Sequence, residues 1–106
     1  MRTHIRPAKY RNRPTEADGI AFDSKAEARR YRQLKAMKEG GEILWFTCQP
    51  SFRLLGNTRY RPDFLVCGKD GLLWAEDVKG VETEAFRLKK NDWEQLYPGF
   101  ELRVIR

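Results

Sequence analysis

The hydrophobic period of this sequence changes at Gly40-Gly41, and this change restricts the possible folds more than any other feature. Ser24 and Glu27 have the spacing of a capping box and predict a helix over 25–38. The apolar residues of that segment recur at helical spacing, at Ala28, Tyr31, Leu34 and Met37. After the glycines, short apolar runs separated by turn residues predict strands. The chain therefore combines helix and sheet in one fold.

The expected strands cover 19–22, 43–48, 51–55, 60–67, 72–79 and 100–105. Gly68-Lys69-Asp70-Gly71 predicts a hairpin turn. Thr83 begins a second expected helix, which runs to about residue 97 and stops at Pro98-Gly99. This order predicts an α/β fold, a small mixed sheet flanked by helices. Since the strands are apolar on both faces, we expect both faces of the sheet to be covered.

The 106 residues carry a formal net charge of +6, and the excess lies at the N-terminal end. Residues 16–106 contain 16 basic and 15 acidic side chains, whereas residues 1–15 contain five basic side chains and no acidic one. These five are Arg2, Arg6, Lys9, Arg11 and Arg13. We therefore divide the chain into a basic arm over 1–18 and one domain over 19–106. Such an arm is typical of a segment that follows polyphosphate, and equally of a solubilising tail.

Composition excludes several classes of protein. A hydrophobic fraction of 41% excludes disorder throughout, and no apolar run is long enough to span a membrane. The N-terminus is polar and basic, unlike a signal peptide. Cys48 and Cys67 have no partner spacing, so neither a disulfide framework nor a zinc site is indicated. We expect a cytoplasmic protein without a membrane partner.

Acidic residues interrupt two neighbouring expected strands. Alternation along 72–79 places Asp77 and Lys79 on one face and Glu76 on the other. Asp63 follows Pro62 within the apolar run of the strand across the hairpin. A carboxylate in a core strand is costly unless it is paired or binds a metal. The hairpin therefore predicts two carboxylates and a lysine on one side of the sheet.

Two acids and a lysine suit metal-assisted hydrolysis of a phosphodiester. Mg²⁺ prefers carboxylate oxygens completed by water and phosphate, which makes Asp63 and Asp77 candidate ligands, with the Val78 carbonyl as a further one. Lys79 would orient the attacking water and stabilise negative charge. Alternatively, Asp77 and Lys79 form an exposed ion pair that contributes less than about 1 kcal/mol. A β-bulge would exchange Asp77 with Glu76.

Two further polar residues have alternative explanations. Glu27 is explained as position N3 of a capping box, but it also borders the buried stripe of its helix. A helix packed on the sheet would point Glu27 at the two aspartates. Gln49 ends the strand 43–48 and would contact either metal-bound water, DNA or the edge of the sheet.

Basic residues outside the arm are candidates for contacts to a nucleic-acid backbone. Lys89 and Lys90 in the second helix are either solvated or bound to phosphate. Arg59 and Arg61 shortly precede Asp63 in the sequence, and we expect them to hold the nucleic-acid backbone beside the site. We find no element suited to recognising bases.

Three sequence blocks carry a family resemblance: Phe22-Asp23-Ser24-Lys25-Ala26-Glu27, Tyr60-Arg61-Pro62-Asp63-Phe64-Leu65 and Glu76-Asp77-Val78-Lys79-Gly80. In this order they resemble the PD-(D/E)xK nuclease superfamily, in particular phage endonuclease I type Holliday-junction resolvases and a related family of small phage and prophage proteins. The resemblance covers 19–106. It implies a restriction-endonuclease-like αβββαβ core and Mg²⁺-dependent cleavage of DNA, with Mn²⁺ as a substitute.

The resemblance also implies roles for individual residues. Glu27 matches the helix acid, Asp63 the acid after proline, Asp77 the strand acid and Lys79 the lysine. The resolvases usually have glutamate in place of Asp77, and their segment corresponding to 43–60, which carries subunit exchange, is longer. These differences leave open a homodimer that cleaves paired junctions and a monomer that nicks DNA or cleaves flaps.

The expected function is therefore that of a metal-dependent endodeoxyribonuclease acting on branched or duplex DNA. The resemblance implies a role in phage recombination or DNA packaging, in the cytoplasm of a bacterial host. The alternative is a non-catalytic nucleic-acid-binding protein that has kept the nuclease fold.

Overall fold

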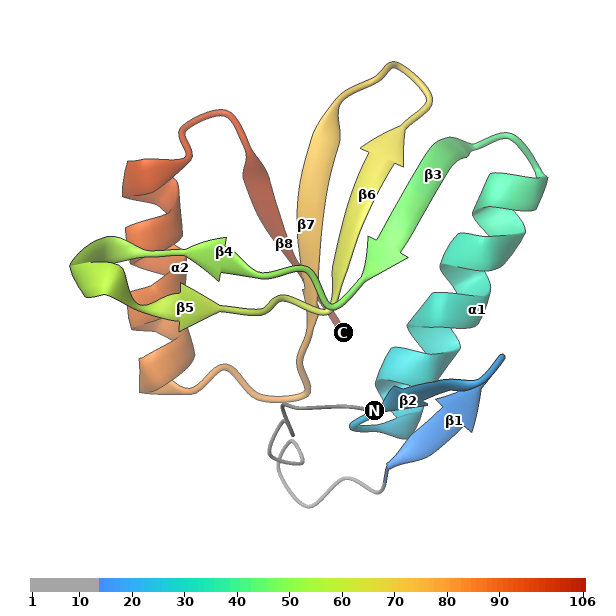
Figure 1. The fold of residues 1–106 in the computed structure, drawn as a ribbon, viewed down its shortest axis with the longest axis horizontal. Helices are drawn as coiled ribbons and strands as arrows, with labels where there is room; N and C mark the ends of the chain where they lie inside the picture. The colour runs from blue at the N-terminus through green and yellow to red at the C-terminus, as the bar shows by residue number, and fades with distance from the viewer. Residues whose placement is uncertain (1–13) are drawn as a thin grey trace.

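A four-stranded mixed sheet forms the centre of the computed structural model, which describes residues 14–106 (Figure 1). The strand order is β3-β6-β7-β8, with the bounds Ile43–Cys48, Phe64–Gly68, Leu73–Val78 and Glu101–Ile105. β3, β6 and β7 are antiparallel, and β8 runs parallel to β7. The predicted α/β class with a mixed sheet and two helices is confirmed. The predicted contacts of the arm, at Arg2, Arg6, Lys9, Arg11 and Arg13, lie outside the described residues.

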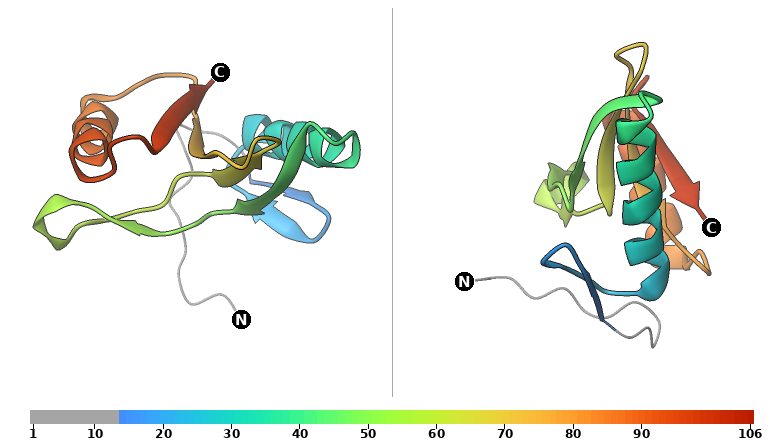
Figure 2. Two further views of the ribbon diagram at one scale, coloured as in Figure 1. Left: turned by 90° about the horizontal axis from the view of Figure 1, so that it is seen from above. Right: turned by 90° about the vertical axis from the view of Figure 1, so that its right-hand side faces the viewer.

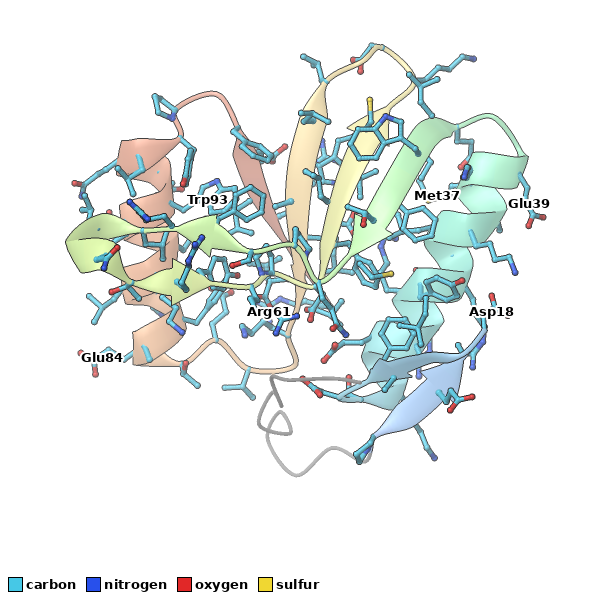
Figure 3. The ribbon with its side chains drawn as sticks, viewed as in Figure 1. Asp18, Met37, Glu39, Arg61, Glu84 and Trp93 are labelled. Atoms are coloured by element: carbon cyan, nitrogen blue, oxygen red, sulfur yellow. The ribbon has the colours of Figure 1, made fainter. Side chains whose placement is uncertain are left out.

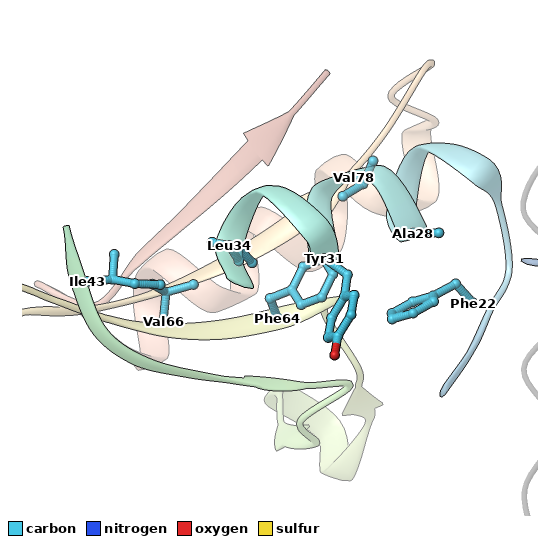
Figure 4. Close-up of a cluster of buried hydrophobic side chains, with 8 residues drawn as sticks. All are labelled: Phe22, Ala28, Tyr31, Leu34, Ile43, Phe64, Val66 and Val78. Atoms are coloured by element: carbon cyan, nitrogen blue, oxygen red, sulfur yellow. The ribbon is translucent and has the colours of Figure 1, made fainter. Parts of the chain in front are cut away.

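Helix α1 (Lys25–Glu39) begins where the capping box predicts, with the Ser24 side chain accepting a hydrogen bond from the Glu27 backbone N–H. Its apolar stripe packs on the sheet in a buried cluster that includes Phe64, Val66 and Val78 (Figure 4). This stripe is the predicted one: Ala28, Tyr31 and Leu34 are buried, and Met37 packs at the edge of the cluster.

A short hairpin of β1 (Thr15–Ala17) and β2 (Ile20–Phe22) lies against α1 (Figure 1). Its turn is Asp18-Gly19, and both residues have positive φ. Hydrogen bonds from Lys35 and Tyr31, 2.8 Å each, hold the pKa of Asp18 below its ordinary value. Two side chains of α1 therefore fasten this turn to the helix.

Helix α2 (Glu84–Leu96) packs on the opposite face of the sheet. Thr83 caps it, and its buried aromatics Phe86 and Trp93 form a second cluster with Ala75 of β7. Val78 of the same strand belongs to the cluster under α1. Since side chains alternate along a strand, odd residues of β7 face α2 and even residues face α1. The two helices flank the sheet on different sides (Figure 2).

The prediction of one strand over 60–67 is wrong. β5 (Arg59–Tyr60) pairs with β4 (Phe52–Arg53) in a separate hairpin across a 3-10 turn, Leu55–Asn57, and this hairpin extends alongside α2 (Figures 1 and 2). The central strand β6 begins only at Phe64. Pro62 separates the two strands because it has no backbone N–H to donate to a ladder. The expected strand 51–55 is accordingly reduced to two residues.

The expectation that both faces are covered is wrong for one end of the sheet. Trp45 of β3 pairs with Cys67 of β6, and Cys67 pairs with Leu73 of β7. Their side chains therefore lie side by side on the face of the sheet on which α2 packs. Trp45 and Leu73 are 40% and 43% exposed. The face opposite α1 is therefore open where β6 turns into β7. In the range 14–106 no helix has the length and hydropathy needed to span a membrane.

Candidate active site

Two buried aspartates lie where β6 begins and β7 ends. Asp63 immediately precedes β6 and is 1% exposed, and Asp77 is the penultimate residue of β7 and is 2% exposed. The Asp63 backbone N–H donates to the Glu76 carbonyl at 2.8 Å, and its Oδ2 accepts from the Val78 N–H at 2.6 Å. Asp63 is therefore locked to the end of β7. The proposed role of the Val78 carbonyl as a ligand stays a prediction.

The Asp77 carboxylate is held between a cation and a hydroxyl. Lys79 Nζ lies 3.1 Å from its Oδ1, and the Tyr60 hydroxyl donates a hydrogen bond to its Oδ2. Lys79 is itself 18% exposed, with Nζ 4.6 Å from the centre of the Phe86 ring. The same-face ion pair of the alternative explanation is therefore present, but its carboxylate is buried and not exposed. A desolvated pair of this kind interacts more strongly than a surface pair.

Glu76 lies on the other face, under α1, and is fully buried. Arg30 donates to both of its oxygens, from Nε to Oε1 and from Nη2 to Oε2, each at 2.8 Å. Trp74 Nε1 adds a third bond at 2.8 Å. The hydrogen bonds to Glu76 raise the pKa of Arg30. The pairing of β6 with β7 has no bulge, so Asp77 and not Glu76 shares the side of Lys79.

Glu27 is fully buried in the first turn of α1. Its backbone N–H donates to Ser24 Oγ at 3.1 Å, and the Ser24 hydroxyl donates to its Oε2 at 3.4 Å, so Ser24 caps the helix and contacts the Glu27 side chain. The next residue, Ala28, packs in the same cluster as Val78, which places this turn at the end of β7 that carries Asp77 (Figure 4). Within the described range, no three His, Cys, Asp or Glu side chains are grouped closely enough to hold a metal ion. The first turn of α1, which carries Glu27, therefore lies near the end of β7, and among the described residues Glu27 does not complete a three-acid cluster.

Gln49 makes the expected sheet-edge contact. Its side-chain amide donates to the Ala21 carbonyl of β2 at 3.1 Å, and its backbone N–H donates to the Asp63 carbonyl at 2.8 Å. Gln49 has a positive φ of 53°, which lets the chain turn out of β3 at this point. Gln49 thus joins the β1–β2 hairpin to the segment that carries Asp63.

The predicted backbone-binding residues are distributed around α2 and the β4–β5 hairpin. Lys89 Nζ lies 5.8 Å from the centre of the Tyr60 ring, whereas Lys90 pairs with Glu94 at 3.4 Å. Arg59 is exposed on β5, and Arg61 is half-buried where the hairpin joins the sheet (Figure 3). Lys89, Arg59 and Arg61 therefore lie near the segment leading to Asp63, and Lys90 is engaged elsewhere.

Sequence analysis missed Tyr60 and Arg30. Tyr60 was assigned to the expected strand 60–67 without a role of its own. A buried tyrosine hydroxyl needs a hydrogen-bond partner, and the acids of the neighbouring strand, Glu76 and Asp77, were candidates for it. Arg30 lies off the apolar stripe of α1, and nothing in its own position in the sequence pointed to a role. The signal for Arg30 was Glu76 itself, because a buried carboxylate on the helix-facing side of a core strand requires a cation.

The donor set of this site suits a hard divalent cation. Mg²⁺ is commonly held by one or two carboxylates, with waters and substrate phosphates completing its octahedron. Asp63 and Asp77 supply buried carboxylates at adjoining strand ends. A cysteine nucleophile is not supported, since burial raises the pKa of the Cys48 thiol to about 11.

A known protein family matches most of the chain. No curated protein shows significant similarity to the chain. Residues 7–106 match the family described as "Protein of unknown function (DUF1064)". This match includes both helices, every described strand and the aspartate pair. The chain therefore belongs to the DUF1064 family.

Proposed function

We propose that the protein is a Mg²⁺-dependent DNA endonuclease that hydrolyses phosphodiester bonds, and that its family belongs to the PD-(D/E)xK nuclease superfamily. The supporting observation is the Asp77 carboxylate, buried between Lys79 and Tyr60 beside Asp63. Burying two carboxylates at one end of a sheet costs stability, which is a reason to expect a function for them. The three blocks that resemble the superfamily fall at the start of α1, just before β6 and at the end of β7.

The residues have distinct roles in this proposal. Asp63 and Asp77 would hold Mg²⁺, which when bound lowers the pKa of a water molecule and offsets the charge of the phosphate. Lys79 orients that water and stabilises negative charge that develops on the phosphate. Tyr60 restrains the second oxygen of Asp77. Glu27 supports the site from the first turn of α1.

The proposed substrate is branched or duplex DNA in the cytoplasm of a bacterial host, in phage recombination or packaging. The basic arm and the residues Arg59, Arg61 and Lys89 would neutralise the phosphate backbone. Such contacts are independent of base sequence, so the shape of the DNA would select the substrate. Both a monomer and a homodimer are compatible with this proposal.

A non-catalytic nucleic-acid-binding protein is the second candidate. The observation that favours it is the lack, within residues 14–106, of a group of three acidic, His or Cys side chains close enough to hold a metal. In that case the Asp77–Lys79 pair would be a structural remnant of the fold.

The test is cleavage of plasmid, linear duplex and four-way junction DNA with Mg²⁺ and after addition of EDTA. We expect Mg²⁺-dependent products with at least one substrate and none with EDTA. Asp77→Asn should lower the rate at least about 100-fold while DNA affinity stays nearly unchanged, because it removes metal ligation and not backbone contacts.

Glu94→Gln is the matched control, since Glu94 lies on the surface of α2 and, among the described residues, pairs with Lys90 alone. It should cleave like the wild type. Absence of cleavage with both Mg²⁺ and Mn²⁺, together with retained DNA binding, would favour the non-catalytic candidate. Full activity of Asp77→Asn would remove this residue from the site.

A further inference from the structure

We propose that the β4–β5 hairpin is a binding element for the phosphate backbone of DNA, with Arg53 and Arg59 acting together as a phosphate clamp. This inference rests on the proposed function, because it assigns the partner of the clamp as the substrate of the same site. It adds Arg53, which the sequence did not single out, and it gives the hairpin a role separate from that of the basic arm.

The register of the hairpin places the two arginines side by side. Arg53 pairs with Arg59, and Phe52 pairs with Tyr60. Because side chains alternate, the arginines share one face and the aromatic residues share the other. The rings of Phe52 and Tyr60 lie 4.8 and 6.1 Å from the ring of Trp93, so the aromatic face packs on α2. Both arginines are exposed to solvent on the opposite face.

The clamp carries charge that the protein itself does not neutralise. Residues 50–62 contain Arg53, Arg59 and Arg61 and no acidic residue. In the described part of the chain, neither arginine of the clamp forms an ion pair with an acid. Like charges directly opposite each other on paired strands are destabilising, and a bound phosphate would relieve this repulsion. Guanidinium groups bind phosphate oxygens in bidentate geometry.

The hairpin is fastened to the candidate site, which favours the substrate of that site as the ligand. Tyr60 donates to Asp77, and Tyr97, the C-cap residue of α2, donates to the Arg53 carbonyl at 2.5 Å. Lys89 lies over the Tyr60 ring and adds a third cation near the hairpin. Because DNA carries many phosphates along its length, one duplex could contact the hairpin and the candidate site together. Figure 2 shows the hairpin projecting from the central sheet.

The test is a DNA-binding measurement in EDTA, so that cleavage does not enter. Fluorescence anisotropy would follow labelled duplex and four-way junction DNA over a series of NaCl concentrations. We expect Arg53→Gln/Arg59→Gln to bind about 10-fold more weakly at physiological salt. The slope of log affinity against log salt should fall by about 1.8, because two phosphate contacts are lost.

The matched control is Arg29→Gln/Arg32→Gln, which removes the same charge from exposed positions of α1, far from the hairpin (Figure 1). It should change the slope by less than half as much. Arg53→Lys/Arg59→Lys keeps the charge and should keep most of the slope. The glutamine variant should melt at no lower temperature than the wild type, because it removes opposed like charges. If it does not fold, the two single variants, each expected to lose about half of the slope change, replace it.

The outcomes separate the clamp from the nuclease. If the clamp variant binds DNA as tightly as the α1 control, the clamp is wrong, whatever the cleavage assay shows. If binding is lost as expected but the wild type never cleaves DNA, the clamp stands and the endonuclease proposal fails. Competition by polyglutamate as strong as by DNA of equal charge would indicate an acidic protein partner and overturn the clamp.

Discussion

Two adjacent acidic residues of β7 have entirely different surroundings, and this difference decides which of them has a chemical role. Glu76 is neutralised by a bidentate bond from Arg30, so its oxygens are committed to structure. Asp77 points to the other face, where its partners are Lys79 and Tyr60. A one-residue shift of the strand would exchange them, and the unbroken pairing of β6 with β7 prevents that shift.

At the residue scale, we predict that Tyr60 is a positioning residue for Asp77. Tyr60→Phe removes one hydrogen bond and leaves the ring packing on Trp93 in place. We expect about 10-fold weaker Mn²⁺ binding, measured by electron paramagnetic resonance, and a lower kcat with unchanged KM for DNA. The physical reason is that the carboxylate loses the contact that restrains its second oxygen.

Tyr97→Phe is the control for this prediction. It also removes one tyrosine hydroxyl, which donates to Arg53 in the same hairpin but does not contact Asp77. Both variants should lose about 0.5–1.5 kcal/mol of unfolding free energy. Equal effects of the two on Mn²⁺ affinity would show that Tyr60 acts only through the stability of the hairpin.

At the scale of elements, strand β7 is the junction between the two halves of the fold. Its even residues pack under α1 and its odd residues face α2. The buried Arg30–Glu76 pair joins α1 to the sheet, and an aromatic cluster joins α2 to it. The Arg30–Glu76 pair connects α1 to β7 across 46 positions of sequence. This pair therefore helps to hold α1, the helix that carries Glu27, against the sheet.

We predict that Arg30→Met destabilises the protein by about 3 kcal/mol or more, since Glu76 is left as a buried charge without its cation. The double variant Arg30→Met/Glu76→Met should recover most of this loss. Urea unfolding of the wild type, both single variants and the double variant measures the coupling. Additive effects would mean that the two side chains do not interact in solution.

At the scale of the whole molecule, positive charge and candidate chemistry occupy different parts of the chain. Residues 16–106 are nearly neutral overall, and the excess charge belongs to residues 1–15. In the described structure, Arg53 and Arg59 lie opposite each other on the β4–β5 hairpin, and Lys89 of α2 lies over the Tyr60 ring. The basic arm and the cations around the hairpin are therefore two separate candidates for contacts to the DNA backbone. The hairpin is joined to the candidate site by the hydrogen bond from Tyr60 to Asp77.

Deletion of residues 1–13 should weaken DNA binding and lower its salt dependence, while the melting temperature stays unchanged. The cut spares Thr15, which pairs with Phe22 in the β1–β2 hairpin. The measurement is the slope of log affinity against log salt, as for the clamp, and five basic residues predict a fall of up to about 4.5. An unchanged slope would assign the arm to solubility alone.

Local signals predicted much of this fold. Ser24 and Thr83 start the helices where the capping residues indicated, and Gly68–Gly71 forms the turn of the central hairpin. Prediction failed at Tyr60, because 60–67 was treated as one strand although Pro62 interrupts it and the chain passes to another sheet there. The reason is that a strand pattern reports burial and not the identity of the neighbouring strand.

The sequence by itself determined the order of elements and the alternation that separates Asp77 from Glu76, because capping, turns and strand period are local properties of the chain. Only the tertiary structure decided which side chains meet these carboxylates. Arg30, Tyr60 and Lys79 reach them from a helix, a separate hairpin and the end of the same strand. Two of these contacts join residues distant in sequence, and such contacts arise from the packing of elements, which no local pattern encodes.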